Sequence, residues 1–379
     1  MVFKKSFFIL FIIIILATII RLFFVFNIPS QIDELIMADL IKTVSLGNIP
    51  VHFSSVNGEN ITIIYLAVPF YRIFNTQTVL IFRFIALVFN SGFIILTFLL
   101  LKNFFSEKLA LVAAALLAIW PWSIKAGSIG YNAYLLLFLY SAGLYLFFLA
   151  MKKGRLVFYF SAVFFWAISF YTYSLSFVWV PLFLLIIFII YRRDINLKHF
   201  IYSLIFLLIL IIPISLFFLK NQFHLVTLNY FLFFNIPDLA ISRFDTISIF
   251  TLYDGVWIAL NYFFNYFLHF ALLFLSYNPT SDSFWFYLVY LWDVPLIFLG
   301  LFVCLKNFKQ NKFYQLLVIW FFTYPLASSF INAEGGFSST RDIHSLPLLA
   351  ILSAIGILIF WDSLKKLYLI KLSGNKTSS

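Results

Sequence analysis

Two adjacent carboxylates, Asp33 and Glu34, follow the first long apolar run of the sequence, within Pro29-Ser30-Gln31-Ile32-Asp33-Glu34-Leu35. A carboxylate held close to a membrane surface could act as a general base on an acceptor hydroxyl. Helix capping is the other reading, because Ser30 is a good N-cap and acidic side chains stabilise the first turn of a helix. One carboxylate can serve both purposes, so Asp33 and Glu34 are both candidate catalytic residues.

A second candidate segment runs from Trp120 to Asn132 and contains one charged side chain, Lys125. Its tryptophans are typical of a chain that turns at a membrane–water interface, where they serve as anchors. Lys125 could instead bind an anionic group such as a lipid phosphate. We therefore treat Lys125, Tyr131 and Asn132 as candidate substrate-binding residues.

The third candidate segment, residues 332–344, ends in Arg341-Asp342-Ile343-His344. The planar guanidinium of Arg341 suits a bidentate contact with a phosphate, and His344 could add a second donor. Arg341 could also form a local ion pair with Asp342 or Glu334. His269 is a further substrate-binding candidate, although an amphipathic residue at the membrane interface is the plainer interpretation of it.

Metal chemistry finds little support in the sequence. Cys304 is the only cysteine, and no histidines or carboxylates have the spacing of a ligand set. Asp33 and Glu34 could share a cation, but neighbouring side chains on a helix point in different directions. We expect no metal, no other cofactor and no disulfide within the chain.

Membrane-spanning helices must position these candidates. Hydrophobic residues make up 64% of the 379 residues and charged residues 10%, whereas a soluble domain averages about 25% charged residues. Apolar runs long enough to cross a hydrocarbon core of about 30 Å recur along the chain. We expect an all-α, polytopic protein of about ten transmembrane helices. The runs lie at about 7–26, 78–101, 109–124, 130–151, 156–173, 175–191, 199–219, 288–305, 313–330 and 345–361.

The charges orient these helices. Basic residues gather in the short loops on one side, which the positive-inside rule makes cytoplasmic. Most of the 25 lysines and arginines and both chain ends then lie inside, whereas most of the 14 acidic residues lie outside. The net charge of +11 therefore reflects topology and does not indicate a nucleic-acid partner. We expect a multi-pass protein of the plasma (inner) membrane with cytoplasmic termini and an outward-facing site. Arg21 and Arg83, near outer ends of spans, could extend to the interface.

The predicted outer loops, at about 27–77, 220–287 and 331–344, are long, whereas the inner loops are short. We expect residues 1–379 to form a single transmembrane domain without a separate soluble domain. Two apolar segments within these loops are predicted to be interfacial helices. From Trp257 to Leu275, Asn261, Asn265 and His269 recur at every fourth residue and form one polar stripe. The segment from Ile61 to Phe74 is too short to span the membrane and contains Pro69 and Arg72.

Several short motifs occur in a fixed order along nearly the whole chain. They are Asp33-Glu34 after the first span, Ile64-Tyr65-Leu66 with Pro69 and Phe74, Arg83, Ala118 to Trp122, Tyr171-Thr172-Tyr173-Ser174 with Pro181, and Glu334-Gly335-Gly336 to Thr340-Arg341 with Leu346-Pro347. In this order they resemble the superfamily C glycosyltransferases. Within that superfamily the chain resembles the dolichyl-phosphate-mannose–protein mannosyltransferase and aminoarabinose transferase group of bacterial membrane proteins.

The resemblance implies a hexosyl- or pentosyltransferase of the cell envelope. It implies transfer of a sugar from a polyprenyl-phosphate carrier to a protein, lipid or glycan hydroxyl at the outer leaflet, by an inverting mechanism that needs no metal. The acidic residue of the first outer loop, which maps onto Asp33, would be the catalytic base. Arg341 is the best match to the residue that holds the carrier phosphate.

The chain departs from this family pattern in its second outer turn. Related proteins often carry an arginine where Ser128 stands and an acid where Asn132 stands. Lys125, about one helical turn earlier, could replace the arginine, but nothing replaces the acid. A catalytically silent, transferase-like scaffold of cell-envelope glycan assembly is therefore one alternative. A lipid or solute transporter is another, although such proteins usually place ionisable residues near the midplane and often show internal repeats, neither of which the sequence contains.

Overall fold

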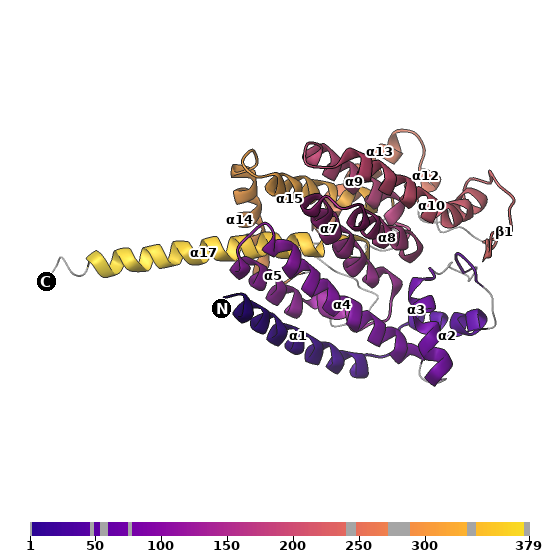
Figure 1. Cartoon of the computed structure of the whole chain (residues 1–379), viewed down its shortest axis with the longest axis horizontal. Helices are drawn as coiled ribbons and strands as arrows, with labels where there is room; N and C mark the ends of the chain where they lie inside the picture. Colours follow the sequence, from indigo (N-terminus) through magenta and orange to yellow (C-terminus); the bar gives the residue numbers. More distant parts are fainter. Residues whose placement is uncertain are drawn as a thin grey trace.

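The computed structural model describes residues 2–45, 49–53, 60–74, 78–239, 248–271, 289–331 and 339–374. These residues form a largely helical molecule (Figure 1), which confirms the helical class. The sequence analysis did not predict its two-stranded antiparallel ribbon, in which Tyr230 pairs with Asn235 and Phe231 with Phe234. The start of α1 and the end of α17 both lie toward the left of the view in Figure 1.

The first half of the chain forms a series of helices: α1 (Val2–Asn27), α2 (Ile32–Ser45), α3 (Thr62–Phe74), α4 (Thr78–Lys102), α5 (Glu107–Ile119), α6 (Pro121–Ala126), η1 (Asn132–Leu135), α7 (Leu136–Lys153), α8 (Leu156–Thr172), α9 (Ser176–Tyr191) and α10 (Leu197–Asn221). The second half contains the ribbon and further helices: β1 (Tyr230–Phe231), β2 (Phe234–Asn235), α12 (Ile249–Leu252), α13 (Val256–Ala271), α14 (Asp293–Lys306), α15 (Lys312–Thr323), α16 (Pro325–Ser328), η3 (Ser339–Ser345) and α17 (Leu346–Gly374).

Five segments of the described chain are long and apolar enough to cross a membrane: Lys5–Asn27, Thr78–Lys102, Asn132–Lys153, Leu197–Asn221 and Thr340–Tyr368. This number is smaller than the ten predicted, partly because some apolar runs are divided. The run at 109–124 is interrupted at Trp120, whose ψ of 138° ends α5. Pro121 then starts α6, and a residue before proline disfavours the helical conformation. The run at 313–330 is likewise divided between α15 and α16.

The short basic loops meet at one end of the molecule. Lys312 Nζ lies 2.6 Å from Asp194 Oδ2, which joins the α9–α10 loop to the start of α15. Phe104, in the α4–α5 loop, stacks on Phe313 with ring centroids 4.1 Å apart. These two contacts bring the α4–α5 and α9–α10 loops to the start of α15, and the side of the membrane on which they lie stays a prediction.

Two arginines that were expected to extend to the interface are buried. Arg83 is 3% exposed and Arg21 is not exposed at all. Arg21 donates hydrogen bonds to the Asn90 and Ser123 side chains and to the carbonyl oxygens of Ala17, Leu117 and Ala118. These acceptors come from α1, α4, α5 and α6, so Arg21 fixes the helices directly behind the turn that carries Lys125.

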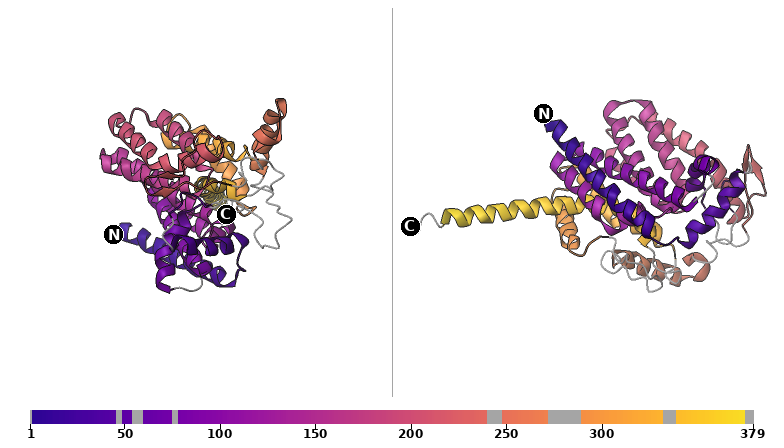
Figure 2. Two further views of the ribbon diagram at one scale, coloured as in Figure 1. Left: turned by 90° about the vertical axis from the view of Figure 1, so that its right-hand side faces the viewer. Right: turned by 90° about the horizontal axis from the view of Figure 1, so that it is seen from below.

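Two of the three residues in the polar stripe of α13, Asn265 and His269, face the protein, whereas the stripe of an interfacial helix was expected to face water. Asn265 and His269 are 1% exposed. Asn265 Nδ2 donates to the carbonyl oxygens of Ser329, at 3.2 Å, and Ile331, at 3.1 Å. The opposite face carries large exposed side chains, namely Trp257, Leu260, Phe263, Phe264 and Phe267. At the edge of the molecule (Figure 2), α13 therefore presents an apolar face outward, as a helix in contact with lipid does.

Candidate active site

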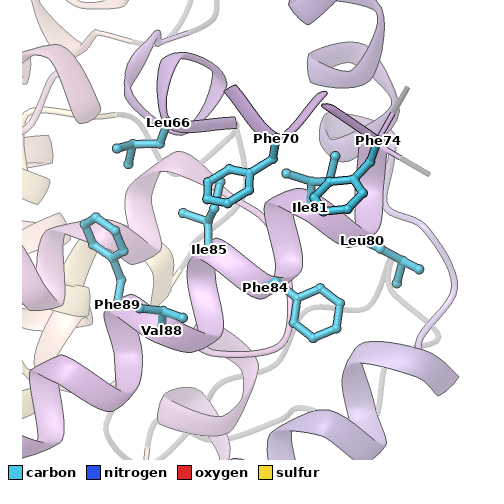
Figure 3. A pocket seen from close by; sticks show the side chains of 9 residues that line it. All are labelled: Leu66, Phe70, Phe74, Leu80, Ile81, Phe84, Ile85, Val88 and Phe89. Atoms are coloured by element: carbon cyan, nitrogen blue, oxygen red, sulfur yellow. The ribbon is translucent and has the colours of Figure 1, made fainter. Parts of the chain in front are cut away.

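Four separate parts of the chain line one cavity of about 290 Å³: Gln31, Asp33, Glu34, Lys125, Ile129, Tyr131, Tyr134, Tyr173, Thr340 and Arg341. Each of the three segments singled out from the sequence contributes a charged residue, namely Asp33, Lys125 and Arg341. These charged and hydroxyl-bearing side chains distinguish this cavity from a groove of about 580 Å³ between α3 and α4, which is lined only by apolar side chains (Figure 3).

The first turn of α2 presents Asp33 to the cavity. Gln31 precedes the helix, and its backbone N–H donates to Glu34 Oε2 at 2.9 Å. This is the reciprocal half of a capping box, in which the third helical residue satisfies the N–H at the start of the helix. Glu34 is therefore the member of the acidic pair that caps the helix. Asp33 is only partly buried and lines the cavity.

Glu34 is a candidate catalytic residue whose two oxygens are both occupied. Its Oε1 accepts from Arg83 Nε and from the Gly130 N–H, each at 2.8 Å. Its Oε2 accepts from Arg83 Nη2 at 2.7 Å, in addition to the Gln31 N–H. With four donors on its two oxygens and no exposed surface, this carboxylate is not available to an acceptor hydroxyl in the cavity. Glu34 instead holds α2, α4 and the turn after α6 together around the cavity.

Gly130 allows this turn to approach α4. A Cβ atom at residue 130 would lie 2.3 Å from Phe82 Cβ and 2.9 Å from the Phe82 carbonyl carbon. We expect Gly130→Ala to push the turn away from α4 and to break the Gly130–Glu34 hydrogen bond, at a cost of about 1–3 kcal/mol. Thermal unfolding of the purified protein measures this loss. The matched control is Gly92→Ala, where the added Cβ would meet only the ring of Phe138. Equal melting temperatures for the two variants would contradict the expectation.

Two cations, Lys125 and Arg341, line the cavity together with Asp33. Lys125 Nζ lies 4.5 Å from the centroid of the Trp122 ring, and burial lowers the pKa of its ammonium. Among the described residues, neither Lys125 nor Arg341 has a carboxylate within ion-pair distance. Asp342 contacts His269 and Ser328, so the local Arg341–Asp342 pair considered from the sequence does not form. Glu334, the other suggested partner, lies outside the described residues.

The two positions that depart from the family pattern point into the protein. Ser128 is fully buried, and its hydroxyl donates to the Ile124 carbonyl at 2.8 Å. Asn132, a substrate-binding candidate, is 1% exposed and is not among the residues that line the cavity. Its Oδ1 accepts from the Ile63 N–H at 3.0 Å, and its Nδ2 donates to the Asn60 carbonyl at 2.9 Å. Asn132 therefore fixes the first turn of α3 next to η1.

His269 and His344, two further predicted substrate-binding residues, are not among the residues that line the cavity, so their predicted role gains no support from its geometry. Both are 1% exposed and neither lines the cavity. His344 Nε2 lies 3.0 Å from the Tyr324 carbonyl oxygen, and His269 Nδ1 contacts Asp342 Oδ2. Both histidines thus bind buried polar groups of the protein, as buried polar side chains generally do. Tyr131, the remaining binding candidate, does line the cavity.

Sequence reasoning missed several lining residues, above all Tyr134 and Tyr173. The rings of Tyr131 and Tyr134 meet edge to face, with centroids 5.4 Å apart. Tyr173 belongs to the quoted Tyr171–Ser174 motif, so a signal for it existed but was not connected to the site. Within the described parts of the chain, no three histidine, cysteine, aspartate or glutamate side chains come together in a way that could hold a metal ion.

Comparison with protein families confirms the resemblance inferred from the sequence. The model of the dolichyl-phosphate-mannose-protein mannosyltransferase family matches residues 60–217. This match includes Arg83, Lys125 and Tyr173, but it ends before Arg341 and begins after Asp33. The comparison with curated protein sequences gives no match.

Solved structures with a similar fold include the oligosaccharyltransferase of Archaeoglobus fulgidus. The enzyme AglB in complex with an inhibitory peptide and a dolichol-phosphate is 14% identical, with a TM-score of 0.63 over 98% of this chain and 52% of that chain. The apo form is 13% identical, with a TM-score of 0.61 over 97% of this chain and 52% of that one. A form tethered to an acceptor peptide is 15% identical, with a TM-score of 0.61 over 95% and 50%. The chain thus spans about half the length of these archaeal proteins and shares their fold.

Proposed function

We propose that this protein is a membrane glycosyltransferase that moves a sugar from a polyprenyl-phosphate carrier to an acceptor hydroxyl, with Asp33 as the general base. The observation that carries the proposal is the cavity in which one carboxylate, Asp33, is combined with two cations, Lys125 and Arg341. The family match over residues 60–217 and the fold shared with a dolichol-phosphate-binding oligosaccharyltransferase support the same class of reaction.

The charges in the cavity favour a donor with a single phosphate. Among the lining residues that the structure describes, Glu34 is paired with Arg83, and the other charged side chains are Asp33, Lys125 and Arg341, which together carry one net positive charge. The remaining single positive charge matches a phosphodiester between a sugar and a polyprenol. A diphosphate carries a further negative charge, and a third cation in addition to Lys125 and Arg341 would be needed to balance it.

The size of the cavity favours a single sugar. A volume of about 290 Å³ is at the lower end of small-molecule sites, which begin at about 300 Å³. Tyr131, Tyr134 and Tyr173 offer apolar ring faces together with hydroxyl groups, a combination that suits the mixed surface of a sugar. The groove between α3 and α4 (Figure 3) is lined only by apolar side chains, which suits the hydrocarbon tail of the carrier.

In the proposed reaction, Asp33 accepts the proton of the acceptor hydroxyl while the hydroxyl oxygen attacks the anomeric carbon. The bond between that carbon and the phosphate oxygen breaks, and its electron pair goes to the departing polyprenyl phosphate. Lys125 and Arg341 stabilise the negative charge that grows on this phosphate. Because attack and departure occur on opposite faces of the sugar ring, the configuration at the anomeric carbon is inverted. No strong general acid is needed for so good a leaving group.

We also propose that the cavity faces outward from the plasma (inner) membrane, with both termini in the cytoplasm. The basic loops around Lys312 and Phe104 form the opposite end of the molecule from α2, α3 and the cavity, which supports this orientation.

Purified protein offered radiolabelled polyprenyl-phosphate hexoses and pentoses tests the proposal directly. We expect transfer of label to a protein, lipid or glycan acceptor from at least one donor, with no requirement for a divalent cation. The matched arm uses the same sugars on polyprenyl diphosphate, for which we expect little or no transfer. Absence of transfer from every monophosphate donor would overturn the proposal in favour of a silent scaffold.

Lys125 is expected to give donor binding a distinctive pH dependence. A lysine is charged below its pKa, and burial lowers the pKa of Lys125, so its charge is lost at a lower pH than that of an ordinary lysine. The KM for the donor should therefore rise as the pH increases toward that lowered pKa. In Lys125→Arg the cation persists and this rise should disappear, whereas Lys125→Gln should raise KM on the order of tenfold at neutral pH. Identical pH profiles for Lys125→Arg and the wild type would contradict this, and Lys42→Arg on α2 is the control.

A further inference from the structure

We propose that His269 is a positioning residue that holds Arg341 in the cavity through Asp342. This inference rests on the proposed function, since it assigns Arg341 the role of holding the donor phosphate. It links α13, which does not line the cavity, to the group that would bind the donor.

Asp342 is the centre of this link. It follows Arg341 directly in the chain and has no exposed surface. Its Oδ2 accepts from His269 Nδ1, and its Oδ1 accepts from the Ser328 hydroxyl at 2.8 Å. Each carboxylate oxygen thus has a partner on a different helix, α13 in one case and α16 in the other. A buried carboxylate held at both oxygens fixes its own position and that of its neighbour along the backbone.

The backbone on both sides of Asp342 is fixed by the same cluster. The Ser328 hydroxyl also lies 3.2 Å from the Arg341 carbonyl oxygen, and the Ser345 hydroxyl donates to the Asp342 carbonyl at 2.7 Å. The Tyr324 hydroxyl in turn donates to the His269 carbonyl at 3.2 Å. The short helix η3, which carries Arg341, is therefore tied to α13 and α16 by side chains and not by apolar packing alone.

The position of α13 connects the outer surface of the protein to Arg341. Its outward face is apolar and exposed, whereas its inward face holds Asn265 and His269. The position of Arg341 in the cavity thus depends on a helix whose outer face is apolar and exposed. Loss of the His269–Asp342 contact should loosen η3 and weaken donor binding, while Asp33 and its helix stay unaffected.

Steady-state kinetics of His269→Ala, His269→Asn, Arg341→Gln and the His269→Ala/Arg341→Gln double variant test the inference. We expect His269→Ala to raise the donor KM about tenfold with a smaller change in kcat. His269→Asn should restore most of the affinity, because its amide nitrogen can stand where Nδ1 stands. The double variant should be no worse than Arg341→Gln, since His269 acts through Arg341. Asn261→Ala is the control, because the Asn261 side chain bonds only to the Trp257 carbonyl of its own helix.

A purely structural role gives a different result. Additive losses in the double variant, or a failure of His269→Asn to restore the KM, would overturn the inference. Amide hydrogen exchange of residues 339–345 provides a readout that does not depend on catalysis: it should be faster in His269→Ala than in Asn261→Ala, and equal rates would also overturn the inference. Lack of transfer by the wild-type protein would instead reject the proposed function, and the exchange measurement would still test the link.

Discussion

Asp33→Asn is expected to abolish sugar transfer while the protein remains folded and membrane-inserted. The asparagine keeps the size of the side chain but cannot accept the proton of the acceptor hydroxyl. Removal of a general base typically costs about 10²- to 10⁴-fold in rate. The measurement is kcat for transfer from the labelled donor, together with the equilibrium binding of that donor, which should change little because the two cations of the cavity remain.

Asp39→Asn is the matched control for this experiment. Asp39 lies on the same helix α2, but its side chain is 80% exposed and pairs with Lys42 at 2.8 Å. It should retain the kcat of the wild type. Full turnover by Asp33→Asn, or an equal loss in both variants, would remove Asp33 from the mechanism.

Arg83→Gln is expected to cause the largest loss of stability. The substitution leaves Glu34 buried without its cation, and breaking a buried ion pair by removing one partner costs about 3–5 kcal/mol. Glu34→Gln should be milder, because Arg83 would keep the carbonyl oxygens of Val25, Ile28 and Pro29 as acceptors. Thermal unfolding measures both effects, and transfer should fall in the same order because Asp33 is adjacent to Glu34.

The comparison for Arg83→Gln is Arg72→Gln on α3, where the side chain is exposed. That variant should unfold within a few degrees of the wild type. If Glu34→Gln proves more damaging than Arg83→Gln, the account of Arg83 as the only cation that compensates Glu34 is wrong.

Sequence patterns predicted the helices and the three site segments because both depend on local features. Apolar runs mark helices in a membrane protein, and Asp33, Lys125 and Arg341 are unusual charges at the ends of such runs. The break between α5 and α6 could also have been inferred, since Pro121 follows Trp120 directly. The number of spans was harder to obtain, because hydropathy does not reveal where a helix ends inside an apolar run.

The orientation of side chains around the site could not be obtained in this way. The polar stripe of α13 is visible in the sequence, but whether Asn265 and His269 face water or buried carbonyl groups depends on α16 and η3, which are distant in the chain. In the same way, Asp33 and Glu34 are neighbours in the sequence, so the sequence alone could not show which of them is the catalytic base. The two differ because Arg83, on α4, and Gly130, in the turn after α6, bind Glu34.

Asn132 occupies a position at which an amide and a carboxylate are not interchangeable. Its amide both accepts from the Ile63 N–H and donates to the Asn60 carbonyl, and an aspartate could do only the first. An aspartate at residue 132 would set a carboxylate oxygen against the Asn60 carbonyl oxygen in a buried position. The acid that the family resemblance leads one to expect at this position therefore does not fit the present course of the chain at Asn60.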